Sequence, residues 1–283
     1  MNLERLLPNV CRIAVEAGAL IEQLYQADEC IDVKNKLDGT PVTIADKQAD
    51  ALICNALQTL TPDIPLLTEE SVGNVPFKRR QAWSTFWCVD PLDGTKEFIE
   101  RTGEFSVNIA LVQNGVAVLG VVYVPLTRVL YCATKGQGAY RSTITQQVKN
   151  QNWQACMAPE QKIKSRLKSN KSPTKVAVSR RHGTITKRFF DALDEVELVF
   201  MGSAIKSCLV AEGTVDIYPR FGPTSLWDTA AAQCVVEESG GLLMDANGKP
   251  LTYFQTESLL NPHFLVVGDP YYDWPPFPKH KSV

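Results

Sequence analysis

Two aspartates stand three positions apart in the segment Trp87-Cys-Val-Asp90-Pro-Leu-Asp93-Gly-Thr95. The aromatic and β-branched residues before Asp90 predict a strand, and we expect it to stop there because Pro91 donates no backbone hydrogen bond. Two carboxylates in one tight turn can converge on a hard cation. The same residues also suit an ordinary β-turn, so the metal interpretation depends on further acids.

The residues that follow these aspartates offer a place for a phosphate. We expect Asp93 to cap a helix. The amides of Gly94 and Thr95 in the first turn would then be free to bind an anion. One short segment therefore indicates metal ligands beside a phosphate site.

Two other segments supply acids of the same kind. Glu69 and Glu70 follow a short predicted strand, and Asp228 opens a predicted helix of small residues. The simpler alternatives are that Glu70 faces solvent and that Asp228 is a first-turn acid favoured by the helix dipole. Oxygen ligands from separate elements, in a chain with only three histidines, favour Mg²⁺ over zinc.

The elements that must position these acids follow from periodicity and turn signals. Helices are predicted over residues 3–25, 44–60, 184–193, 203–212 and 226–239, and an exposed loop over 35–41. Strands are predicted over residues 65–67, 83–89, 105–112, 116–124, 128–133, 175–179, 196–200, 215–219, 241–244 and 263–267. The order indicates the α/β class with layered helices and sheets.

The same order predicts two halves around a cleft. Residues 1–140 form an α+β half with a large antiparallel sheet and most of the candidate ligands, and residues 141–174 form a connector. Residues 175–283 form an α/β half that closes the active-site cleft.

Composition excludes several classes of protein. The 283 residues carry a formal net charge of -2, so a nucleic-acid polymer is not an expected partner. No apolar stretch approaches the roughly 20 residues that span a bilayer, and the amino terminus has no apolar signal core. The eight cysteines are dispersed without a C-x-x-C pair, which predicts free thiols in a reducing compartment. We therefore expect a cytoplasmic protein.

Positive charge is concentrated in the segment 162–188, which contains no acidic residue. A solvated loop and helix face would explain it. The alternative, which we favour less, is attraction of a small, multiply charged anion.

Four motifs resemble those of the inositol monophosphatase family, the magnesium-dependent and lithium-sensitive phosphatases. They are Asp38 to Asp46, Thr68 to Ser71, Asp90 to Thr95, and Trp227 to Ala231. Within that family the chain is most similar to the bacterial 3′(2′),5′-bisphosphate nucleotidases, through residues 93–98, 103–109, 202–206, 211–213 and 218–227.

The resemblance implies an alternating α/β/α/β/α sandwich of the sugar-phosphatase type and a set of metal ligands. Glu69, Asp90 and the Leu92 carbonyl would hold one Mg²⁺. Asp90, Asp93 and Asp228 would hold a second. Two or three ions per site are expected, and Li⁺ is expected to inhibit.

The resemblance also implies catalytic and substrate-binding roles. Glu69 would orient the attacking water, and Thr95, hydrogen-bonded to Asp46, would help to deprotonate it. The substrate would contact Glu69, Leu92, Asp93, Gly94, Thr95 and Asp228 around the reacting phosphate, and Lys206, Tyr218 and Arg220 beyond it.

The implied reaction is hydrolysis of adenosine 3′,5′-bisphosphate to AMP and phosphate, in sulfate assimilation and the recycling of this nucleotide, with its sulfated analogue as a second substrate. Two alternatives stay open: an inositol-1-phosphate phosphatase, and a catalytically silent metal- or nucleotide-binding scaffold. The resemblance leaves open a monomer or a homodimer, and a peripheral association with the inner membrane.

Overall fold

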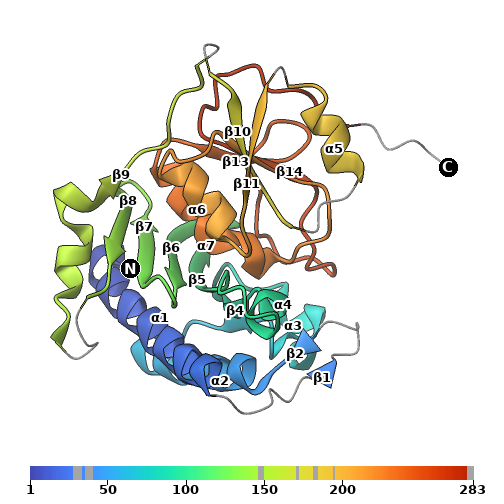
Figure 1. Ribbon diagram of the computed structural model, residues 1–283. Helices are drawn as coiled ribbons and strands as arrows, with labels where there is room; N and C mark the ends of the chain where they lie inside the picture. The colour runs from blue at the N-terminus through green and yellow to red at the C-terminus, as the bar shows by residue number, and fades with distance from the viewer. Residues whose placement is uncertain are drawn as a thin grey trace.

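A computed structural model describes residues 1–27, 34–35, 41–145, 150–169, 172–180, 184–193 and 195–278. Helices and two sheets alternate in five layers, so the predicted α/β/α/β/α order is confirmed (Figure 1). Asp38, the first residue of one of the four motifs, lies outside the described part of the chain. The same holds for Cys30, one of the eight cysteines, and for Lys171 and Arg181 of the basic segment 162–188.

The larger sheet has seven strands in chain order, which confirms the predicted meander. Its strands are β3 (Leu66–Thr68), β4 (Thr85–Asp93), β5 (Ser106–Gln113), β6 (Val116–Val124), β7 (Val129–Thr134), β8 (Gly138–Thr143) and β9 (Lys162–Ile163). All neighbours are antiparallel except the parallel pair β3 and β4. Strand β8 runs across the boundary expected at residue 140, and the expected connector contributes β9.

Two long helices, α1 (Leu3–Gln26) and α2 (Ile44–Leu60), cover one face of this sheet (Figure 1). Apolar side chains from both helices, including Ile13 and Ile53, are fully buried in one core with Trp87 of β4. The Trp87 indole donates to the Thr61 hydroxyl at the end of α2, at 2.8 Å. This core therefore fixes α2 against the strand that carries Asp90.

The smaller sheet has the order β11-β10-β12-β14-β13. Its strands are β10 (Thr174–Val178), β11 (Val196–Phe200), β12 (Ile217–Arg220), β13 (Leu242–Met244) and β14 (Phe264–Val267). Strand β10 pairs in parallel with β11 and β12, whereas β14 is antiparallel to β12 and β13. The predicted alternation of helix and strand therefore produces a mixed sheet.

Two helices, α6 (Ile205–Ala211) and α7 (Leu226–Glu238), lie between the sheets, and α5 (Thr184–Phe190) covers the outer face of the smaller one (Figure 1). The remaining elements are short: β1 (Lys34–Asn35), β2 (Pro41–Val42), α3 (Phe77–Arg80), α4 (Thr95–Ile99), η1 (Val72–Asn74), η3 (Trp153–Met157) and η4 (Pro159–Gln161). None of the described helices combines the length and the apolar character needed to cross a bilayer.

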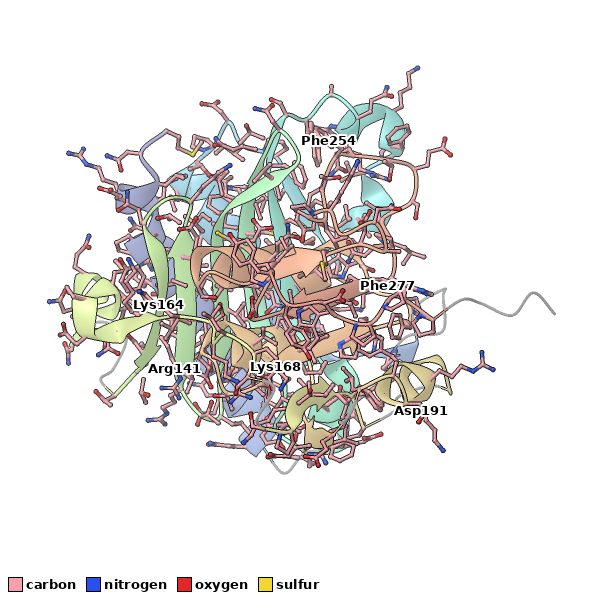
Figure 2. All side chains as sticks on the ribbon, turned by 90° about the horizontal axis from the view of Figure 1, so that it is seen from above. Arg141, Lys164, Lys168, Asp191, Phe254 and Phe277 are labelled. Carbon is pink, nitrogen blue, oxygen red and sulfur yellow. The ribbon has the colours of Figure 1, made fainter. Side chains whose placement is uncertain are left out.

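The basic segment meets acids from other parts of the chain. The guanidinium of Arg166 binds both carboxylate oxygens of Asp216 at 2.7 Å. Lys175 pairs with Glu197 at 3.2 Å, and Arg180 pairs with Glu104. Lys164 stays exposed on the outside of the molecule (Figure 2). Part of the positive charge that the sequence concentrates here is therefore neutralised within the fold.

The seven cysteines within the described residues are free, as predicted, and all except Cys54 are buried.

Helix α7 approaches the larger sheet closely at Gly120 of β6. A Cβ atom at this position would lie 2.2 Å from the Ala231 carbonyl oxygen and 2.9 Å from the Cys234 Cβ. Only glycine allows α7 to lie this close to the sheet. The distance between α7 and the sheet in turn determines where Asp228 lies relative to β4.

We expect Gly120→Ala to destabilise the protein by about 1–3 kcal/mol, because the methyl group forces α7 outward. Denaturant unfolding measures this. The matched control is Gly73→Ala, where a Cβ meets nothing within 4 Å, and its effect is expected within about 0.5 kcal/mol. Equal stability of the two variants would contradict the packing argument.

Candidate metal centre and active site

Three acids from three elements converge on one point. Glu69 follows β3, Asp90 lies in β4, and Asp228 lies in the first turn of α7. One carboxylate oxygen from each lies within 4.8 Å of the others. An all-oxygen donor set of this size suits a hard divalent cation such as Mg²⁺.

The parallel pairing of β3 and β4 brings the first two acids together. Thr68 lies opposite Val89, and the Glu69 amide donates to the Val89 carbonyl at 3.2 Å. Because both strands run in the same direction, the residues that follow this pair emerge at the same edge.

Strand β4 continues beyond Asp90, so the expectation that it stops there is wrong. Asp90 pairs with Asn108 and Asp93 with Ser106, with a register shift between them. An irregularity of this kind accommodates Pro91, which cannot donate to the ladder. The Leu92 amide turns inward and donates to Asp90 Oδ1 at 3.0 Å.

Helix α4 begins one residue later than expected, with Gly94 rather than Asp93 as its cap. Gly94 has a left-handed φ of 97°, and a Cβ there would lie 3.3 Å from the Phe105 Cα. A left-handed residue in so little space favours glycine over aspartate.

The Asp93 side chain contacts the start of α6 and strand β5 instead of capping α4. Its Oδ2 accepts hydrogen bonds from the Ala204 amide at 2.6 Å and from the Asn108 side chain at 3.2 Å. Asp93 is not one of the three acids that lie within 4.8 Å of one another. It lines the adjoining pocket, together with Asp228.

Thr95 and Asp46 form the pair that the resemblance implies. The Thr95 hydroxyl donates to Asp46 Oδ1 at 2.9 Å, with the Leu92 carbonyl at 3.4 Å as an alternative acceptor. Asp46 Oδ2 accepts from the Thr43 amide at 2.7 Å and from its hydroxyl at 2.6 Å. Asp46 is 2% exposed, so its position is fixed by these bonds and by α2.

The electrostatics of the acid cluster favour a bound cation. Burial, followed by the charges of Asp93 and Glu69, raises the pKa of Asp228 to about 8. Burial, followed by the charge of Glu69, also raises the pKa of Asp90 well above its usual range. Carboxylates that repel one another away from water need a positive charge to ionise together. The residues present therefore fit a divalent cation.

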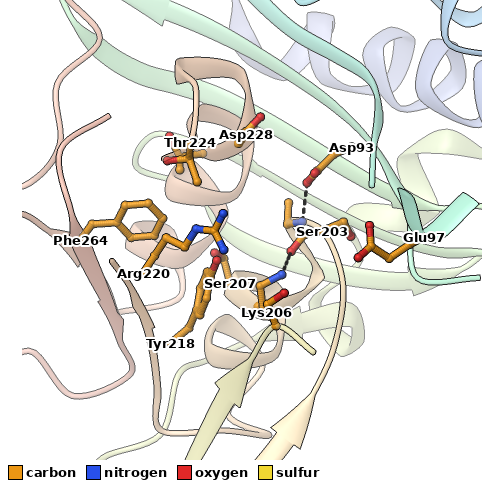
Figure 3. Close-up of a pocket in the computed structure, with 13 residues that line it drawn as sticks. Asp93, Glu97, Ser203, Lys206, Ser207, Tyr218, Arg220, Thr224, Asp228 and Phe264 are labelled. Atoms are coloured by element: carbon orange, nitrogen blue, oxygen red, sulfur yellow. Dashed lines mark hydrogen bonds between the residues drawn. The ribbon is translucent and has the colours of Figure 1, made fainter. Parts of the chain in front are cut away.

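Basic and aromatic side chains line the pocket beside Asp93 and Asp228 (Figure 3). Lys206 is buried, donates to the Ser203 carbonyl at 2.6 Å, and lies over the Tyr218 ring at 5.1 Å. Burial lowers the pKa of Lys206 to about 8, although the Asp93 charge opposes this shift. Arg220 donates to the Pro223 carbonyl at 3.1 Å.

Several contacts at the site were not predicted from the sequence. Asn108 orients Asp93, and the Ser106 hydroxyl donates in turn to Asn108 Oδ1 at 3.0 Å. The Ala204 amide reaches Asp93 because the chain passes close to Glu104 at Gly202. A Cβ atom at Gly202 would lie 2.4 Å from the Glu104 carbonyl oxygen, so this approach requires glycine. The only sequence signal is that buried strand β5 carries polar residues at 106 and 108.

Known proteins are similar to this chain in sequence and in fold. Residues 2–267 match the inositol monophosphatase family. The 3′(2′),5′-bisphosphate nucleotidase CysQ of Escherichia coli (strain K12) is 43% identical over 262 residues, which cover 92% of this chain and 99% of that protein. The protein of the same name from Haemophilus influenzae is 37% identical over 273 residues, 96% of each chain.

Two solved structures extend this comparison. The crystal structure of CysQ from Bacteroides thetaiotaomicron has a TM-score of 0.78 and 39% identity, and covers 92% of this chain and 96% of that chain. Inositol monophosphatase from Anabaena has a TM-score of 0.71 and 25% identity, and covers 95% of this chain and 93% of that chain. The chain therefore belongs to the inositol monophosphatase family, whose members depend on a metal ion, typically Mg²⁺.

Proposed function

We propose that the protein is a Mg²⁺-dependent 3′(2′),5′-bisphosphate nucleotidase that hydrolyses adenosine 3′,5′-bisphosphate to AMP and phosphate. The observation that carries this proposal is the convergence of Glu69, Asp90 and Asp228 beside a pocket with two buried or half-buried cations, Lys206 and Arg220. The curated nucleotidases at 43% identity support the same substrate class. Recycling of this nucleotide belongs to sulfate assimilation.

In this proposal the acids divide between two cations. Glu69, Asp90 and the Leu92 carbonyl would hold one Mg²⁺, and Asp90, Asp93 and Asp228 would hold the second. Bound in this way, the ions supply neutralisation of the phosphate charge and activation of a water. The same proposal includes inhibition of the enzyme by Li⁺. It also allows a third Mg²⁺ at the site.

Thr95 and Asp46 supply the path for the proton. The Thr95 hydroxyl already donates to Asp46 Oδ1, so its lone pairs are available to a water on the other side. As the water oxygen bonds to phosphorus, the bond between phosphorus and the ribose 3′-oxygen breaks. The water's proton moves to Thr95 Oγ1, the Thr95 proton moves to Asp46, and the released 3′-oxygen takes a proton from solvent. Glu69 orients the water for this attack.

The pocket lined by Lys206, Tyr218 and Arg220 accepts the part of the substrate that does not react. Two positive side chains suit the second phosphate of the nucleotide, and the aromatic ring offers a surface for the base. Inositol 1-phosphate has no second phosphate to bind these cations. A silent scaffold is not favoured, because every proposed ligand and Thr95 are present.

We expect phosphate release from adenosine 3′,5′-bisphosphate to exceed release from inositol 1-phosphate in Mg²⁺, and to vanish with a chelator. A phosphate assay on both substrates measures this, with Li⁺ added in a further arm. Preference for the inositol ester would keep the chemistry and overturn the substrate. Release from neither ester would favour the silent scaffold.

We expect Thr95→Val to lower kcat by roughly 10²–10⁴-fold, because the variant removes the proton acceptor and keeps the shape. Steady-state kinetics in saturating Mg²⁺ measure this. Thr95→Ser should restore much of the rate. The control is Thr59→Val, an exposed α2 threonine whose hydroxyl only binds the Asn55 carbonyl. An unchanged kcat in Thr95→Val would remove Thr95 from the mechanism.

Stability should depend on Mg²⁺ and pH together. The pKa of Asp228 is raised to about 8 in the fold, against about 3.9 in an unfolded chain. Without a cation, the unfolded chain ionises this carboxyl while the fold keeps it protonated, so the stability of the fold falls progressively as pH rises between these values. Mg²⁺ binds the ionised form and cancels this loss.

We therefore expect the rise in Tm on adding Mg²⁺ to be larger near about pH 8.5 than near about pH 6. Differential scanning fluorimetry measures this. Asp228→Asn cannot ionise at this position and should lose most of the response. Equal responses at both pH values would contradict the assignment of Asp228 as a cation ligand.

A further inference from the structure

The segment 251–261 crosses helix α7 from its C-terminal half back to its first turn, and we call it the strap. Near one end, the Gln233 side chain donates to the Leu251 carbonyl at 3.0 Å. Near the other end, the Leu226 amide donates to the Leu259 carbonyl at 2.9 Å. The strap is therefore bonded to α7 at both of its ends.

The strap ends at Asn261, whose amide group reaches the start of α7. Its Nδ2 lies 2.6 Å from the Ser225 carbonyl and 3.1 Å from the hydroxyls of Thr224 and Thr229. Its backbone amide donates to the Thr224 carbonyl at 2.8 Å. A side-chain amide has two hydrogens, so it satisfies two of these acceptors at a time, and the Ser225 carbonyl is the nearest.

Ser225 in turn holds Asp228 from both sides. The Ser225 amide donates to Asp228 Oδ2 at 2.8 Å, and the Asp228 amide donates to the Ser225 carbonyl at 3.1 Å. Asn261 and Asp228 therefore share one carbonyl acceptor. A movement of Ser225 would carry the Asp228 carboxylate with it.

The strap also meets the segment that follows Glu69. Arg80, in helix α3, donates to the Gln255 side chain at 3.0 Å and to the backbone carbonyls of Thr256 and Glu257 at 2.7 and 3.1 Å. Arg80 is 4% exposed, so this contact is an internal one. The strap thus connects α7, which carries Asp228, with α3, which follows Glu69 along the chain.

Repulsion between the clustered carboxylates tends to push the first turn of α7 away from β3 and β4. A fixed hydrogen bond on Ser225 opposes this movement without touching the cation. We propose that Asn261 is a positioning residue that holds Asp228 in place for the divalent cation, an inference that rests on the proposed function. It binds neither substrate nor metal and acts only through Ser225.

The test is Mg²⁺ binding by isothermal titration calorimetry on the whole protein without substrate. Asn261→Ala should raise the Mg²⁺ dissociation constant about 10- to 100-fold, the usual effect of removing a group that orients a metal ligand. In kinetics, the Mg²⁺ concentration for half activation should rise in parallel, while kcat in saturating Mg²⁺ stays near that of the wild type. If Asn261→Ala does not fold, Asn261→Leu keeps the side-chain shape without the donors.

Tyr253→Phe is the matched control. It removes strap hydrogen bonds to the Gln233 side chain at 2.5 Å and to the Thr229 hydroxyl at 3.1 Å, but none to Ser225. This variant should lower the Tm and leave the Mg²⁺ dissociation constant unchanged.

The outcomes separate the two proposals. If Asn261→Ala binds Mg²⁺ as tightly as the wild type or Tyr253→Phe, the positioning role is overturned and the proposed function stands. If the wild-type chain itself binds no Mg²⁺, the proposed function fails, and the positioning role fails with it.

Discussion

Mutual repulsion of acids that are largely removed from water is the constraint on which the rest of the structure depends. Glu69, Asp90 and Asp228 lie within 4.8 Å of one another, and their ionisation together is unfavourable without a cation. The fold therefore has to hold them against this force. The parallel pair of β3 and β4 fixes the first two, and the close approach of α7 at Gly120 fixes the third.

The same local device positions an acid on each side of the site. Asp46 and Asp228 both lie at the third position of a helix. The Oδ2 atom of each accepts a hydrogen bond from the backbone amide of the cap residue, Thr43 for Asp46 and Ser225 for Asp228. One carboxylate oxygen is thus used to begin the helix. The other oxygen is available for chemistry, as the bond from Thr95 to Asp46 Oδ1 illustrates.

The sequence predicts the helices, the strands and the candidate acids because each depends on local signals. That Glu69, Asp90 and Asp228 share one site is implied by the family resemblance. Periodicity locates α1, α2 and the meander, and the motif around Asp90 marks the site. Two local predictions are wrong. Strand β4 continues past Asp90 instead of stopping there, and Gly94, not Asp93, caps α4. In both cases the pairing of β4 with β5 determines the backbone conformation and overrides the local turn propensity.

The contacts that orient the acids are beyond local reasoning, because they join distant parts of the chain. The Ala204 amide and Asp93 are 111 residues apart, and Asn261 and Ser225 are 36 apart. Nothing in the sequence near Asp93 or Asp228 indicates these partners. They arise where the start of α6 meets the end of β4 and where the strap packs against α7, so only the folded chain reveals them.

The central claim is that the clustered acids form a divalent-cation site. A crystal structure of the protein grown with Mn²⁺, with anomalous scattering recorded for that ion, tests it most directly. The account predicts an anomalous peak bounded by the carboxylates of Glu69, Asp90 and Asp228. A well-ordered site with no peak there, at Mn²⁺ concentrations that support phosphate release, would contradict it.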